Sequence, residues 1–131
     1  LIEGDFAAYG VFGKLNNNGN FSPLEATDTT VYGLLVRAYP TQSAVNELGK
    51  ATPTASTVQD VLRRGYMTAV CNAGVAKKGG AVYVRVDAAT TTKPIGGVEA
   101  VADGANTIEI EGAMFMHDAD ASGNVEIAYN I

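Results

Sequence analysis

The sequence has little of several residue types, and each shortage excludes a class of protein. It contains one Cys, one His and no Trp among 131 residues. A single Cys cannot form an internal disulfide, so the fold is not one of the small secreted frameworks that disulfides hold together. No apolar run reaches the ~18 residues that a membrane-spanning helix needs, and no signal-peptide pattern is visible. We therefore expect no membrane partner, and because the first residue is Leu rather than Met, we expect that residues preceded it.

Basic residues are absent from the last part of the sequence. All nine Lys and Arg lie at or before Lys93, together with seven acidic residues, whereas the chain from Pro94 onward has seven acidic residues and no basic one. Such a segment is unsuited to a phosphate backbone, and we expect no nucleic-acid partner. The acids are interpreted as the solvated side of alternating strands. A sharper hypothesis is that they meet basic groups on a partner or on another copy of the chain.

Motifs that carry chemistry are missing too. The sequence has no P-loop, no dinucleotide-binding fingerprint, no zinc-ligand spacing and no Gly-x-Ser-x-Gly nucleophile elbow. Cys71 and His117 could form a catalytic pair only with an orienting group and an oxyanion hole, and nothing beside either residue supplies them. Cys71 is instead interpreted as a small buried hydrophobe. We predict that the protein is not an enzyme and needs no cofactor.

The segment DADASG is the one stretch that resembles a metal site. Asp118, Asp120 and Ser122 match the first, third and fifth positions of an EF-hand calcium loop. Gly123 suits the sixth position, but Tyr129 stands where the loop needs its bidentate glutamate. The same residue types are typical of a tight turn, because they form local hydrogen bonds and tolerate a positive φ. The sequence therefore predicts an acidic turn and no metal ligands.

What the sequence does contain is a series of short strand signals separated by turns. Strands or strand-like segments are expected at Phe6–Gly13, Val31–Tyr39, two pieces about Gly65 within Thr57–Gly74, Ala81–Asp87, Thr107–Glu111, Ala113–His117 and Val125–Tyr129. A short helical turn before Gly65 is the alternative for that stretch. The segment Asn16–Asn20 predicts a turn, and Ser22-Pro23 is expected to interrupt any strand. Residues 41–56 are expected to form a long loop.

These signals predict an all-β fold. Seven or eight short antiparallel strands with long loops and little or no helix are typical of a jelly-roll-like sandwich or a barrel. No repeat and no linker is visible, so residues 1–131 are expected to form a single β domain. The clearest strand is Ala81–Asp87, where Val82, Val84 and Val86 share one side and Tyr83 and Arg85 the other.

Four segments resemble the structural cement, or capsid decoration, proteins of tailed bacteriophages. In order along the chain they are EGDFAAYG, DVLRRGYMTAVCNAG, AKKGGAVYVRVDAAT and IEGAMFMHDADASGNVEIAYNI. The first is similar to that family's Gly-Asp-Phe-Ala opening, the second to its Arg-Arg-Gly-aromatic strand, and the third to its Lys-Gly turn and Val-Tyr-Val-Arg strand. The last is similar to its closing strand, acidic turn and strand. Residues 14–56 are least covered.

The resemblance implies a jelly-roll-like or barrel-like protein on the outer capsid surface of a virion. There it would bind the major capsid protein as a homodimer or homotrimer and strengthen the shell against the pressure of packaged DNA. Many weak contacts repeated over the shell would supply the affinity. Candidate contact residues are Phe6, Tyr9 and Phe12 in the aromatic N-terminal segment, with core packing as their alternative. Arg63 and Arg64 are the other candidates, because Arg is enriched at protein interfaces.

A different class is kept as the alternative function: a carbohydrate-binding or receptor-binding β-sandwich module of a virion or cell surface. Its support is the six Tyr and the calcium-like loop, and the absence of Trp weighs against it. A small β-fold enzyme ranks last, because the sequence offers no reaction centre.

Overall fold

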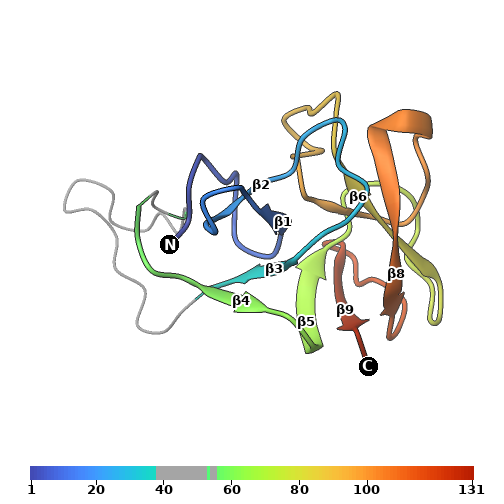
Figure 1. Ribbon diagram of the computed structural model, residues 1–131. Helices are drawn as coiled ribbons and strands as arrows, with labels where there is room; N and C mark the ends of the chain where they lie inside the picture. The colour runs from blue at the N-terminus through green and yellow to red at the C-terminus, as the bar shows by residue number, and fades with distance from the viewer. Residues whose placement is uncertain (38–52, 54–55) are drawn as a thin grey trace, which may run out of the picture.

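The structure, a computed structural model, describes residues 1–37, 53 and 56–131 (Figure 1). Within these residues the chain forms two antiparallel β-sheets, and the one helical piece is the short 3-10 turn Gly104–Asn106. The all-β prediction is confirmed. None of the helices in the described part of the chain is long and apolar enough to cross a membrane.

The first sheet has four strands in the order β2-β1-β3-β4. These strands are β1 (Phe12–Leu15), β2 (Phe21–Pro23), β3 (Gly33–Val36) and β4 (Asp60–Leu62). The predicted Asn-Gly turn joins β1 to β2, and Asn16 stabilises it by accepting the N–H groups of Asn18 and Asn20 at 3.0 Å each. The expectation that Ser22-Pro23 interrupts a strand is wrong. Both residues belong to β2, which lies at the edge of the sheet, where a Pro is tolerated.

The second sheet has five strands in the order β5-β9-β8-β6-β7. These strands are β5 (Gly65–Val70), β6 (Ala81–Arg85), β7 (Val98–Glu99), β8 (Thr107–Phe115) and β9 (Asn124–Tyr129). The prediction of two strands about Gly65 is confirmed: the chain leaves the first sheet after Leu62 and enters the second at Gly65, whose φ is 138°. After β5, a β-bridge between Cys71 and Val98 places the chain next to β7. The two edges of this sheet, β5 and β7, therefore approach each other at this end.

Several predicted boundaries change. The two strands expected at Thr107–Glu111 and Ala113–His117 form one strand, β8, which contains Gly112 at a φ of 79°. Only the last two residues of Phe6–Gly13 are in a strand. Residues 38 and 39 of the strand predicted at Val31–Tyr39 lie outside the described part, as does nearly all of the predicted loop 41–56.

The main core lies between the two sheets. Phe12 of β1 packs edge-on against Tyr129 of β9, with ring centroids 5.4 Å apart. As the alternation predicted, Val82, Val84 and Val86 are all buried in this cluster. A second cluster on the other side of the first sheet contains Ile2, Phe6, Val11, Phe21 and Leu35. The interior is therefore built by contacts between residues far apart in the sequence.

Candidate interaction surface

The aromatic residues predicted to contact a partner lie mostly inside the chain. Phe6 stacks on Phe21 with ring centroids 5.1 Å apart, and Phe12 is fully buried between the sheets. Tyr9 is half-buried, and its hydroxyl donates to Oε1 of Gln59 at 3.3 Å. Core packing, the alternative interpretation, describes Phe6 and Phe12. Of the three, Tyr9 keeps the most surface that a partner could reach.

The arginine pair lies where the chain passes from one sheet to the other. The guanidinium of Arg63 lies 3.8 Å above the ring centre of Tyr32, which is a cation–π contact, and the Arg63 carbonyl accepts Nδ2 of Asn130 at 3.0 Å. Arg64 is exposed and makes no ion pair with any residue of the described part. Both side chains are therefore accessible, but only Arg63 is held by a neighbour.

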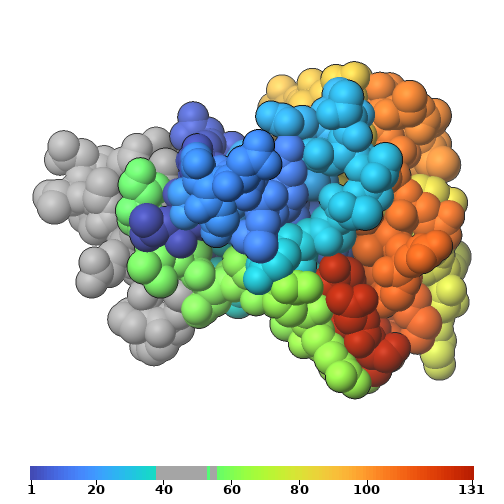
Figure 2. Space-filling view, viewed as in Figure 1, coloured from blue at the N-terminus to red at the C-terminus, as the bar shows by residue number. Residues whose placement is uncertain are grey.

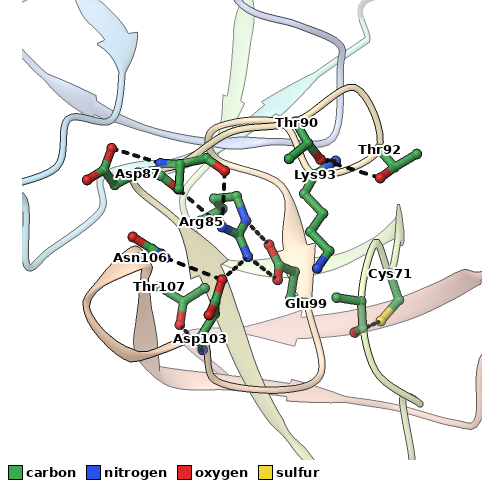
Figure 3. Close-up of polar contacts among 12 residues, drawn as sticks. Cys71, Arg85, Asp87, Thr90, Thr92, Lys93, Glu99, Asp103, Asn106 and Thr107 are labelled. Carbon is green, nitrogen blue, oxygen red and sulfur yellow. Dashed lines mark hydrogen bonds and ion pairs between the residues drawn. The ribbon is translucent and has the colours of Figure 1, made fainter.

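A buried charge network centred on Arg85 was missed by the sequence interpretation (Figure 3). Arg85 is 1% exposed, and its Nε and Nη2 donate to the two carboxylate oxygens of Glu99 at 2.6 and 3.0 Å. Nη2 also donates to Asp103 at 2.8 Å, while Nη1 donates to the carbonyls of Asp87 and Ala88 at 3.2 and 3.4 Å. The network joins β6, β7 and the segments that follow each of them.

These contacts correct the interpretation of the acidic residues as a solvated side, because Glu99 is 1% exposed. The hydrogen bonds that Arg85 donates to Glu99, and then the one that it donates to Asp103, favour the charged guanidinium and raise the pKa of Arg85, while burial opposes them. Hydrogen bonds from Arg85 and then Asn106 lower the pKa of Asp103. A guanidinium whose donors are all directed at acceptors of the chain is a structural element rather than a reaction centre. The one signal in the sequence was Arg85 itself, placed between two buried valines.

The acidic segment DADASG forms the predicted turn. Asp118 pairs with Nζ of Lys77 at 3.1 Å and accepts the N–H of Lys78 at 3.2 Å, and these contacts lower the pKa of its carboxyl. Asp120 accepts two main-chain N–H groups of its own turn at 2.9 Å each, which lowers its pKa as well. Both carboxylates are therefore engaged by groups of the chain. Among the described residues, no three His, Cys, Asp or Glu side chains are grouped as metal ligands.

Cys71 and His117 bond to different main-chain groups. The Cys71 thiol is half-buried and lies 3.2 Å from the Ala73 carbonyl, and burial raises its pKa. A raised pKa keeps the thiol protonated, which is the opposite of what a nucleophile requires. The His117 ring bonds at Nδ1 to the Asp118 carbonyl at 2.7 Å and accepts the N–H of Glu126 at Nε2, 3.3 Å away.

An exposed apolar surface lies on the outer side of the second sheet, and the sequence interpretation did not find it. Tyr66 of β5 and Met114 of β8 are both register partners of Ala128 of β9. Tyr66 is 53% exposed, Met114 is 45% exposed, and the neighbouring Ile131 is 64% exposed. With Met116, these residues line a hollow of about 230 Å³, and we call this surface the apolar face. Figure 2 shows β5 (light green) and β9 (red) side by side at the lower edge of the molecule.

A family described as XM1 gp53 minor capsid protein matches residues 1–129 of this chain. The chain belongs to this minor capsid protein family. The resemblance to capsid-associated proteins of bacteriophages is thereby confirmed, and membership supports a structural role in a phage capsid.

A solved structure has the same fold. In "The capsid of Myoviridae Phage XM1", one chain superposes with a TM-score of 0.72 at 18% sequence identity, and the match covers 98% of this chain and 79% of that chain. At this identity the likeness concerns the fold alone. No curated protein matches the sequence.

Proposed function

We propose that the protein is a cement, or decoration, protein that binds the outer surface of a phage capsid and stabilises the lattice of the major capsid protein. The observation that carries the proposal is the family match over residues 1–129. The two-sheet fold supports it, because a rigid β-sandwich presents fixed surfaces that can be repeated over a shell. Cement action needs only many modest contacts of this kind, since their number supplies the total affinity.

Charge supports the outer surface as the location. The chain has a net charge of −5, and from Pro94 onward it has seven Asp and Glu residues and no Lys or Arg. A protein of this charge is repelled by the phosphates of packaged DNA inside the shell. Its partner is therefore proposed to be the major capsid protein, with neither nucleic acid nor membrane involved.

The proposed shell contacts are Tyr9, Arg63 and Arg64, which the described structure leaves accessible. Phe6 and Phe12 act indirectly. Both are buried in the core, and they thereby hold in place the segment that carries Tyr9. Arg63 is the cleaner residue to test, because its guanidinium is already ordered over Tyr32 and loses less entropy on binding.

Particles with and without this chain test the proposal. If it is a cement protein, its copy number in purified particles is stoichiometric with the major capsid protein, and particles that lack it release DNA at lower temperature. Particles of equal thermal stability, or a few copies per particle, would contradict the proposal.

A matched pair of variants tests the contact residue. Arg63→Gln should lower the occupancy of depleted particles about tenfold at limiting protein, because an Arg at a buried contact contributes 1.4 kcal/mol or more. Lys78→Gln removes the same charge from another exposed turn and should bind as the natural protein does. Equal occupancy for both variants would remove Arg63 from the contact.

The carbohydrate-binding alternative has less support. A sugar-binding platform needs exposed aromatic rings. Of the Tyr residues in the described part, only Tyr66 is largely exposed to solvent. Tyr32 lies beneath Arg63, and Tyr129 is buried. Saturable binding to a glycan array that Tyr66→Ala abolishes would reverse this order.

A further inference from the structure

An open hollow of about 690 Å³ lies along the hairpin formed by β1 and β2, and we call it the hairpin hollow. The carboxylates of Glu3, Glu25 and Asp28 line it, together with the single ammonium of Lys14. Its lining therefore carries a net charge of −2, and none of the lining residues is aromatic. An anionic ligand would be repelled by this charge, so the hollow favours a cation.

Glu3 is held in the wall of the hairpin hollow by the Asn-rich turn. Its Oε2 accepts Nδ2 of Asn16 at 2.8 Å and Nδ2 of Asn20 at 2.9 Å. The hydrogen bond from Asn20, and then that from Asn16, lowers the pKa of the Glu3 carboxyl, which is therefore ionised at neutral pH. Within the described part of the chain Glu3 forms no ion pair. The turn thus fixes a carboxylate that has no cationic partner there, and its Oε1 can still accept hydrogen bonds.

The other two carboxylates of the hollow are paired with Lys14. Nζ of Lys14 lies 2.8 Å from Oε2 of Glu25 and 3.0 Å from Oδ2 of Asp28, which also accepts the N–H of Glu25 at 2.6 Å. A metal ion that used both carboxylates would have to displace this ammonium. A further cation at Glu25 would not, because the side chain of Glu25 is 74% exposed and can contact solvent beside Lys14.

Ser22 adds an unused hydrogen-bonding group to the same hollow. Among the described residues, its Oγ is the buried side-chain polar atom that lacks a hydrogen-bond partner. Ser22 is 9% exposed and lines the hollow. It is the register partner of Lys14, so the two side chains point to the same side of the sheet. A buried hydroxyl without a partner costs free energy, and a donor that entered the hollow as far as Ser22 would recover it.

We propose that the hairpin hollow binds the guanidinium of an Arg side chain presented by a partner protein. The guanidinium donates to the carboxylates of Glu3 and Glu25 and to the Oγ of Ser22. Lys14 stays paired with Asp28 and holds Glu25 in position for the ligand. The Asn-rich turn orients Glu3 in the same way, so the acceptors are in place before the ligand arrives.

The lining favours an Arg over other ligands. A guanidinium carries five N–H donors in one plane and can serve several separate acceptors at once, whereas the ammonium of a Lys is a compact, strongly hydrated point charge. A sugar would find no aromatic ring on which to stack. The inference does not rest on the proposed capsid function, since it concerns the free protein and a ligand as small as a peptide.

Titration of the natural, isotope-labelled protein with an acetylated and amidated Ala-Arg-Ala peptide tests the site by nuclear magnetic resonance. At constant ionic strength the side-chain amide signals of Asn16 and Asn20 should shift and saturate, because both amides donate to Glu3. The side-chain amide of Asn130 donates to the Arg63 carbonyl outside the hollow, and its signal should not move. The matched Ala-Lys-Ala peptide should bind at least about threefold more weakly.

A matched pair of variants tests the role of Glu3. Glu3→Gln should weaken binding of the Arg peptide about threefold, which is the usual worth of an exposed ion pair. Glu111→Gln removes one exposed carboxylate outside the hollow and should bind the peptide as the natural protein does. Equal losses for the two variants would show attraction by net charge alone and would overturn the inference.

Ser22→Ala separates binding from folding. It should weaken binding of the Arg peptide by up to about tenfold, because a hydrogen bond to a charged group is lost. Urea unfolding should nevertheless show the free variant to be at least as stable as the natural protein, since an unpaired buried hydroxyl has been removed. Unchanged affinity would contradict the role of this hydroxyl, and a large loss of stability would show that it has a partner within the chain.

Two results of the titration itself contradict the site. Amide shifts at Asn16 and Asn20 that do not saturate would exclude specific binding, and equal affinity for the Lys peptide would exclude recognition of a guanidinium. A protein that binds the Arg peptide but fails to bind depleted particles would contradict the proposed function alone, so the two proposals fail separately.

Discussion

At the scale of single residues, Arg85 shows how a charged side chain becomes part of a core. Its five N–H donors are directed at Glu99, Asp103 and the carbonyls of Asp87 and Ala88. A buried ion pair of this kind adds little net stability over apolar residues, but removing one partner leaves an uncompensated charge. The network fixes the segments after β6 and β7 relative to each other.

Removing one partner of the Arg85–Glu99 ion pair should therefore destabilise the fold much more than replacing both partners with apolar residues. We expect Arg85→Met or Glu99→Leu alone to lower the free energy of unfolding by about 3–5 kcal/mol, because each leaves a buried charge without its partner. The double variant should lose less than either single variant. Urea unfolding followed by circular dichroism measures all three, and additive losses would show that the two side chains are not coupled.

Asp103 makes part of the stability depend on pH. Its pKa is lowered from 3.8 in the folded chain, mainly by the hydrogen bond from Arg85. A carboxyl with a depressed folded-state pKa contributes its stability above the unfolded pKa and loses it as pH falls through the folded pKa. The midpoint of thermal unfolding should therefore fall as the pH drops below about 4, and it should fall less in Asp103→Asn. Asp5→Asn is the control, and an equal effect of both would exclude Arg85 as the cause.

At the scale of elements, Gly96 sets how closely the two sheets approach. Its N–H donates to the Arg85 carbonyl and its own carbonyl accepts the N–H of Phe12, both at 2.8 Å, so it links β6 to β1. Its φ is 80°, and a Cβ at this position would overlap the Phe12 carbonyl. No larger residue fits between these strands.

Gly19 provides a matched control for this close approach. Its φ is 78°, but a Cβ there would meet no atom within 4 Å. Gly19→Ala should cost only the backbone strain of the left-handed region, about 1–2 kcal/mol. Gly96→Ala adds the overlap with Phe12, so its loss on urea unfolding should be larger. Equal losses would show that the sheets can separate there without cost.

At the scale of the whole molecule, one core joins the two sheets and predicts cooperative unfolding. Phe12 is fully buried against Tyr129 of the other sheet, so removing its ring leaves a cavity that both sheets line. Phe12→Ala should cost about 3–5 kcal/mol, and the far-ultraviolet and tyrosine near-ultraviolet signals should still change together. Two separated transitions would contradict the prediction that the chain is a single domain.

The sequence by itself determined the local features of this protein. The alternation of Val82, Val84 and Val86, the Asn-Gly turn and the interruption at Gly65 depend on side-chain period and backbone freedom, which neighbours along the chain set. The acidic turn at Asp118 was predictable for the same reason. The residues with no local signal for their positions were Phe6 and Phe12, which the sequence could place either in the core or at an interface.

Only the tertiary structure decided which distant residues meet. Glu99 became buried because β7 pairs with β6 and brings its carboxylate to Arg85. The apolar face exists because β9 lies between β5 and β8, which puts Tyr66 and Met114 on either side of Ala128. The order of the strands in a sheet follows from the packing of the whole chain. It cannot be read from the alternation of apolar and polar residues within a single strand.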